Sequence, residues 1–220
     1  MIYKRITLLC GHYGSGKTNV AVNMAYDLKN QFEKVAIADL DIVNPYFRTK
    51  DSANEFMEKG IELICSDYAG SNVDIPALPQ QIYSICDQKE KRVIIDVGGD
   101  DRGALALGRI APSILEENDY EMIFVINCFR PLTRDADSTI EVMREIEYAA
   151  NMKFTAIVNN SNLGEETKAE DVLKSLAYAD EISKKTGLPI KCTSVYNVLY
   201  EDLKEKVSNL FSLNLQKKIN

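Results

Sequence analysis

The chain has 220 residues, 45% of them hydrophobic, and its 33 acidic against 26 basic side chains give a formal net charge of −7. This composition is typical of one sizeable α/β domain, here expected over residues 1–220, and the acidic balance argues against tight nonspecific binding to nucleic acid. The five cysteines form no C-x-x-C motif, and neither a signal segment nor an apolar run of membrane-spanning length is present, so we expect a cytoplasmic protein without a disulfide framework or zinc site.

Short apolar runs alternate with helix-length amphipathic stretches along the chain, a pattern typical of a mostly parallel sheet covered by helices on both faces. The predicted strands are residues 5–10, 34–38, 61–65, 92–97, 122–127, 154–159 and 190–193. The predicted helices are approximately residues 17–30, 45–59, 77–88, 103–117, 134–151, 168–186 and 199–210. The expected fold is therefore an α/β sheet of about seven strands, in which ligands bind beyond the carboxyl ends of the strands.

The first predicted strand leads into a segment that fits the motif G-x-x-x-x-G-K-[ST], running from Gly11 to Thr18, and a predicted helix follows it. Its glycines allow turns in which successive amides face inward and bind phosphate oxygens at a helix start. We expect Lys17 to reach the β- and γ-phosphates and Thr18 to offer its hydroxyl to Mg²⁺. The alternative is a glycine-rich turn that matches by chance. The predicted nucleotide contacts are Gly11, His12, Tyr13, Gly14, Ser15, Gly16, Lys17, Thr18 and Asn19.

Two later strands end in aspartates. The second is followed by Asp39 and Asp41, which can belong to a first switch loop whose helix begins near Pro45. The fourth ends in Asp96-Val97-Gly98-Gly99, with the spacing D-x-x-G, so that Asp96 can hold a Mg²⁺-bound water while the Gly99 amide senses a γ-phosphate. The alternative is that these acidic residues are helix caps or solvated turns.

In these motifs the sequence resembles the MinD/ParA-like P-loop ATPases of the CobQ/CobB/MinD/ParA family, over nearly the whole chain. The resemblance implies ATP and Mg²⁺ as cofactors. It also implies that Asp41 orients or activates the attacking water, with Asp39 near the metal and Asp96 as the Mg²⁺-associated aspartate of the second switch. The predicted catalytic residues are Lys17 and Asp41, and the predicted metal-site residues are Thr18, Asp39 and Asp96.

The resemblance also places Asn159 where the family reads the adenine ring, with the segment around Val195 as the other wall of the base pocket. The proline common in that wall is missing. Independently, an asparagine amide offers a donor and an acceptor that match the adenine edge, and the sequence contains no N-K-x-D motif of the kind that selects guanine. These observations favour ATP, while the plain alternative for Asn159 is a turn residue at a strand end.

The sequence departs from the family at His12 and Tyr13, where the family has lysine and glycine. That lysine reaches across a nucleotide-sandwiched dimer to the partner's phosphates, whereas histidine is shorter and mostly neutral near neutral pH. A tight face-to-face dimer is therefore not expected, and a homodimer of another kind stays open. Arg102 or Arg109 could supply the positive charge instead, although Arg109 fits a surface ion pair better.

The favoured function is an ATP-hydrolysing switch that acts on an unidentified partner protein. One alternative is an ATP-dependent small-molecule ligase of the dethiobiotin-synthetase or cobyrinate-amidating type, and another is a non-hydrolysing ATP-binding regulatory module. The C-terminal residues 200–220 place Leu203, Val207, Leu210 and Phe211 at helical spacing among mixed charges, which favours a helix packed on the sheet over a membrane anchor.

Overall fold

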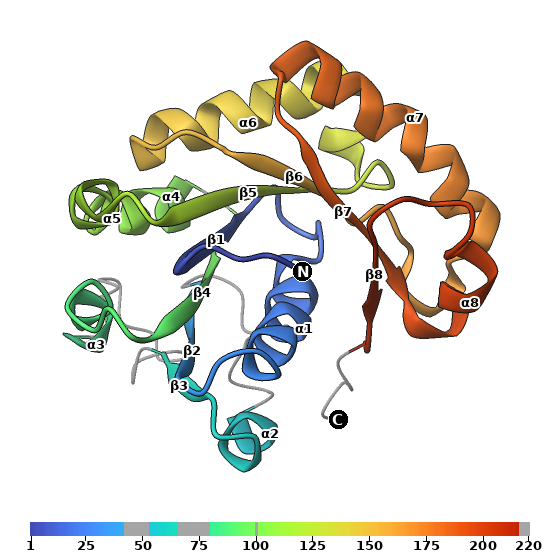
Figure 1. The fold of residues 1–220 in the computed structure, drawn as a ribbon. Coiled ribbons are helices and arrows are strands. Elements are labelled where there is room, and N and C mark those ends of the chain that lie inside the picture. Colours follow the sequence, from blue (N-terminus) through green and yellow to red (C-terminus); the bar gives the residue numbers. More distant parts are fainter. Residues whose placement is uncertain (42–52, 66–79, 100, 216–220) are drawn as a thin grey trace, which may run out of the picture.

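The computed structural model of the chain describes residues 1–41, 53–65, 80–99 and 101–215, without the side chains of residues 80, 101 and 102. Its strands form one eight-stranded sheet in the order β3-β2-β4-β1-β5-β6-β7-β8, and every neighbouring pair is parallel (Figure 1). The α/β class and the parallel sheet predicted from the sequence are thereby confirmed. The strands are β1 Ile6–Cys10, β2 Val35–Leu40, β3 Glu62–Ile64, β4 Arg92–Val97, β5 Tyr120–Ile126, β6 Ala156–Asn159, β7 Ile190–Tyr196 and β8 Leu210–Leu213.

Helices cover both faces of this sheet, because its central strands are largely apolar on both sides and buried except at Tyr120, the first residue of β5. On one face α1 and α2 pack against the sheet, and on the other α3, α4, α5, α6 and part of α7 do so (Figure 1). The α-helices are α1 Lys17–Lys29, α2 Ala53–Glu58, α3 Gln80–Ser84, α4 Asp101–Gly108, α5 Ala111–Glu117, α6 Ala136–Ala150, α7 Ala169–Thr186 and α8 Tyr200–Leu203. Three 3₁₀ turns complete the described elements: η3 Pro131–Thr133, η4 Gly164–Glu166 and η5 Asn197–Leu199.

The C-terminal segment differs from the predicted helix over 199–210. Helix α8 ends at Leu203, and the chain then forms β8, which pairs with β7 from Thr193↔Leu210 to Tyr196↔Leu213. Asn209 lies directly before β8, in the segment that follows α8, and has a φ of +53°. This left-handed conformation is incompatible with a continuing helix and changes the direction of the chain. Leu203 and Val207 do pack together at helical spacing, which is why the sequence pattern suggested a longer helix.

The predicted helix over 103–117 is divided into α4 and α5. Pro112 lies at the first turn of α5, where it lacks the amide that a continuous helix would need. A Cβ added at Gly108 would lie 3.4 Å from the carbonyl of Ala149, so α4 also approaches α6 closely at the break. The first parts of the helices predicted from 45 and 77, including Pro45, lie outside the described residues, as do residues 42–44 and 66–76, which lead into them.

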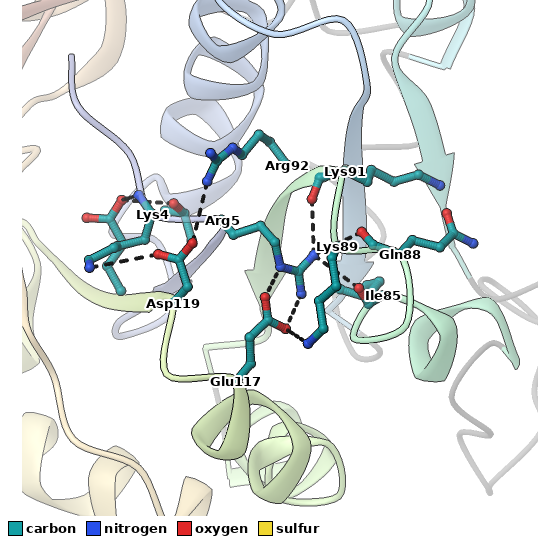
Figure 2. Close-up of polar contacts among 11 residues, drawn as sticks. Lys4, Arg5, Ile85, Gln88, Lys89, Lys91, Arg92, Glu117 and Asp119 are labelled. Atoms are coloured by element: carbon teal, nitrogen blue, oxygen red, sulfur yellow. Dashed lines mark hydrogen bonds and ion pairs between the residues drawn. The ribbon is translucent and has the colours of Figure 1, made fainter.

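A buried ion pair lies at the edge of the sheet where the strands begin (Figure 2). The guanidinium of Arg5, just before β1, donates to the carboxylate of Glu117 at the end of α5, and the two side chains are 4% and 7% exposed. Arg5 Nη1 also lies 3.0–3.3 Å from the carbonyl oxygens of Ile85, Gln88 and Lys91. Burial favours the protonated carboxyl of Glu117, but donation from Arg5 and Lys89 outweighs it and holds the pKa of Glu117 below its usual value.

Candidate functional site

The phosphate-loop motif lies between β1 and α1, as predicted. Gly14 and Gly16 adopt positive φ angles of +75° and +85°, and Gly16 is the N-cap of α1. The amide of Ser15 and the ammonium of Lys17 both donate to the His12 carbonyl, at 3.1 and 3.3 Å. The loop therefore curls around the start of α1, an arrangement that can bind an anion through inward-facing amides.

The turn after β4 lies directly against this loop. A Cβ added at Gly99 would lie 2.7 Å from the backbone nitrogen of Tyr13 and 2.8 Å from Lys17 Nζ. These distances are too short for a side chain, so only glycine fits without displacing the loop or the ammonium. Gly98 lies beside Asp41, whose Oδ1 would be 3.4 Å from a Cβ built there. The structure thus brings Lys17, Gly99 and Asp41 to one place.

Three predicted metal-site residues also meet at this edge. Thr18 Oγ1 donates to Asp96 Oδ2 at 2.6 Å, and Asp96 pairs in register with Asp39 across β4 and β2. Burial raises the pKa of Asp96 to about 8, and the nearby Asp39 carboxylate adds to the rise. Asp39 in turn accepts from the amide of Asp41 at 2.9 Å. Two neighbouring buried carboxylates are costly unless a cation or a proton compensates them.

The oxygen atoms at this position fit Mg²⁺. Among the described residues, Asp96 Oδ1 is buried and has no hydrogen-bond partner, so it remains available to a ligand. Within the described part of the chain, no three His, Cys, Asp or Glu side chains form a metal cage of their own. Mg²⁺ commonly takes one or two protein oxygens and completes its shell with water and substrate phosphates, a role that Thr18 and Asp96 suit.

The predicted base-pocket residues are both buried. The Asn159 side chain donates to Ser175 Oγ at 2.9 Å and accepts from the Ser161 amide at 3.2 Å, so both ends of its amide are engaged inside the protein. Val195 is 1% exposed and packs in a small cluster with Val172, Leu203 and Val207. The structure therefore places both residues beneath the surface, and their contact with a base stays a prediction.

The two residues that replace the family's lysine and glycine are accessible. Tyr13 is 61% exposed, and His12 is partly exposed, with Nδ1 2.9 Å from the Tyr13 carbonyl. Of the two arginines predicted as substitute cations, Arg109 is an exposed residue just after α4. The Arg102 side chain lies outside the described part of the structure.

Sequence reasoning missed two residues that hold the phosphate loop from the other side. Asn160 Nδ2 donates to the Ser15 carbonyl at 2.6 Å, and Arg130 Nε donates to the Gly14 carbonyl at 2.7 Å. No local sequence pattern indicated the role of Arg130, which follows from the strand order: β5 lies beside β1, so its loop ends next to the phosphate loop. Asn160 directly follows Asn159 at the end of β6, so its place at the site is indicated by the sequence itself.

These features agree with the comparison of the sequence with protein families. The model of the CobQ/CobB/MinD/ParA nucleotide binding domain matches residues 6–189. The chain belongs to this family. The phosphate loop, both aspartate-bearing strand ends and Asn159 all lie inside the part that matches the CobQ/CobB/MinD/ParA model, which shows a P-loop nucleotide-binding protein. No curated protein sequence matches the chain.

Solved structures with a similar fold include three proteins named FtsY. One is from Mycoplasma mycoides (18% identity, 86% of this chain and 60% of that chain covered, TM-score 0.54), and one is the cell division protein from Thermotoga maritima (17%, 86% and 61%, 0.57). The third is the signal recognition particle receptor from Elizabethkingia anophelis in complex with GDP (17%, 99% and 62%, 0.52). At these identities the likeness shows the fold alone. The chain spans about 60% of the length of these neighbours.

None of the helices among the described residues is long and apolar enough to cross a membrane. The cytoplasmic location expected from the sequence stays a prediction.

Proposed function

We propose that this chain is a Mg²⁺-dependent ATPase that acts as a nucleotide-controlled switch on a partner protein. The observation that carries the proposal is the contact of Gly99 with Tyr13 and Lys17. The residue expected to bind the terminal phosphates thereby lies so close to the backbone of a second loop that a Cβ built at Gly99 would be 2.8 Å from Lys17 Nζ. A γ-phosphate at Lys17 would compete for the space that Gly99 occupies, so its presence or loss would be transmitted to the chain after β4.

In this proposal each residue has a stated task. Lys17 neutralises the β- and γ-phosphates, and the amides of the phosphate loop bind their oxygens. Thr18 and Asp96 hold Mg²⁺, which offsets phosphate charge when bound. Asp41 orients the attacking water, since it lies beside Gly98 and its amide is fixed to Asp39. This division of tasks makes binding depend on Lys17 and hydrolysis depend on Asp41.

The choice of ATP is supported by the residues at the end of β6. The segment there is Asn159-Asn160-Ser161-Asn162, which lacks the carboxylate that pairs with the N1 and N2 hydrogens of guanine. The amide of Asn162 is also engaged internally, because it accepts from the Gly164 amide at 3.0 Å and donates to Asn160. Nothing in this segment offers an acidic partner to a guanine base.

The proposal is tested by turnover of the purified protein with ATP or GTP, in Mg²⁺ or in EDTA. We expect Mg²⁺-dependent ADP formation that exceeds GDP formation and is lost in Lys17→Ala. A capture experiment then compares Asp41→Ala in Mg·ATP with the wild-type protein in Mg·ADP, and each captured protein is assayed for stimulation of hydrolysis. GTP preference would overturn the base assignment. ADP formation only with an added small-molecule acceptor would indicate a ligase. Stable retention of ATP without turnover would indicate a regulatory module.

A further inference from the structure

Arg130 contacts the phosphate loop from the loop that follows β5. Its Nε donates to the Gly14 carbonyl at 2.7 Å. A Cβ built on Gly14 would lie 3.4 Å from Arg130 Nε, 3.6 Å from its Cδ and 3.8 Å from its Cζ. The guanidinium therefore lies in van der Waals contact with the middle of the phosphate loop, in the same chain.

The segment that carries Arg130 is held by several hydrogen bonds. The fully buried Asn127 accepts from the Phe129 amide through Oδ1 at 3.0 Å, and its carbonyl accepts from Thr133 Oγ1 at 2.8 Å. Pro131 then begins η3, and the Thr133 carbonyl accepts from Tyr178 on α7 at 2.9 Å. A charged side chain on such a pre-organised loop loses little entropy when it binds a ligand.

The charge of Arg130 is not neutralised within the described protein. Among the described residues, the Gly14 carbonyl is the one hydrogen-bond partner of its guanidinium, and no carboxylate pairs with it. By contrast, Arg5 and Arg92 each pair with an acidic side chain. Four of the five guanidinium N–H groups thus remain for a ligand, and their planar arrangement matches phosphate oxygens.

We propose that Arg130 is a phosphate-binding residue, the second cation of the nucleotide site, supplied in cis. It compensates for the absence of the lysine whose position His12 occupies, and it acts from the β5 side while Lys17 acts from α1. The inference rests on the nucleotide site; it uses the proposed function only to choose ATP as the probe. It needs neither hydrolysis nor a protein partner.

The decisive variant is Arg130→Gln. Glutamine Nε2 stands at the same position along the side chain as arginine Nε, so it can still donate to the Gly14 carbonyl, but it lacks the charge and the terminal N–H groups. Arg130→Lys keeps the charge, and Arg130→Met removes both features. Arg134→Gln is the matched control, because Arg134 lies on the same segment, is 79% exposed and has only a 3.7 Å ion pair with Asp135.

Affinity is measured by calorimetry in excess Mg²⁺ with two probes, ATP and inorganic tripolyphosphate, and thermal melting verifies that each variant is folded. We expect Arg130→Gln to weaken both probes about 10-fold or more, which is the loss of one charge-assisted contact. Arg130→Lys should recover most of that loss, and Arg134→Gln should match the wild type.

Three results would overturn the inference. If Arg130→Gln binds both probes like the wild type while Arg130→Met does not, Arg130 acts only through its hydrogen bond to the Gly14 carbonyl. A loss of affinity confined to ATP would indicate that Arg130 contacts the base. An equal loss of affinity in Arg134→Gln would indicate a general effect of surface charge. If the protein prefers GTP or does not hydrolyse ATP, the proposed function fails, yet the tripolyphosphate titrations still decide the role of Arg130.

Discussion

Asp96→Asn should stabilise the protein in the absence of nucleotide and Mg²⁺. Burial raises the pKa of Asp96 from 3.8 to about 8, so the folded state holds a proton that the unfolded chain releases as the pH rises through 4. Because the folded state binds more protons, the free energy of unfolding falls with rising pH between these two values. Asparagine has nearly the same shape, can still accept from Thr18, and does not titrate.

The size of the effect follows from the pKa difference. Each pK unit corresponds to about 1.4 kcal/mol, so the stability difference between Asp96→Asn and the wild type should grow by roughly 4 kcal/mol, as an upper limit, from about pH 5 to about pH 8. Urea unfolding in EDTA at both pH values measures this growth directly. The same variant should lose the Mg²⁺-dependent part of nucleotide binding, since the buried Oδ1 no longer offers a charge.

An equal stability difference at both pH values would refute this reasoning. It would mean that Asp96 is ionised in the folded protein throughout the range, and hence that water or Lys17 compensates its burial. Asp27→Asn is a suitable control, because Asp27 lies on α1 with a 30% exposed side chain at the opposite edge of the sheet, where it accepts from Tyr3.

Four further outcomes are expected. Lys17→Ala should weaken Mg·ATP binding at least about 100-fold in calorimetry, whereas Asp41→Ala should bind Mg·ATP normally but release little phosphate. Turnover at the wild-type rate in Asp41→Ala would exclude Asp41 as the residue that orients the attacking water. Gly99→Ala should also lose nucleotide affinity, because its Cβ would lie 2.8 Å from Lys17 Nζ, while Gly108→Ala should not. Asn159→Ala should lower the free energy of unfolding in urea by about 1–3 kcal/mol and reduce the preference for ATP over GTP in a competition assay. Ser175→Ala, which removes only the hydrogen-bond partner of Asn159, should leave that preference unchanged. Finally, Asp41→Ala should sediment in Mg·ATP as a monomer or as a nucleotide-independent dimer, and a dimer that forms with ATP and is lost on His12→Ala would restore the family's sandwich arrangement.

The parts of the fold that sequence predicted well are those with one dominant signal. Strand β1 and the motif after it have a continuous apolar run followed by residues that only a phosphate loop requires, so their position was unambiguous. The aspartates at the ends of β2 and β4 were also identified, because an acidic residue at the end of a continuous apolar run is conspicuous.

The parts that sequence reasoning misplaced depend on contacts between distant segments. Strand β8 is set by pairing with β7 and by the left-handed turn at Asn209, neither of which leaves a periodic pattern. The contact of Arg130 with Gly14 joins residues 116 positions apart and follows only from the order of strands in the sheet. Local patterns cannot report such pairings.

The phosphate loop is bound differently on its two sides, and this difference supports the proposed switch. Toward β5 and β6, side chains hold two successive carbonyls of the loop, through Arg130 to Gly14 and Asn160 to Ser15. Toward β4, Thr18 at the end of the motif donates to Asp96, but among the described residues no hydrogen bond joins Gly99 to the loop, which it approaches at distances that leave no room for a side chain. A terminal phosphate arriving at Lys17 can therefore displace the chain after β4 without breaking the hydrogen bonds that keep the loop amides aimed inward. A loop fastened equally on both sides would bind nucleotide just as well, but it would have no separate element through which to report which nucleotide is bound.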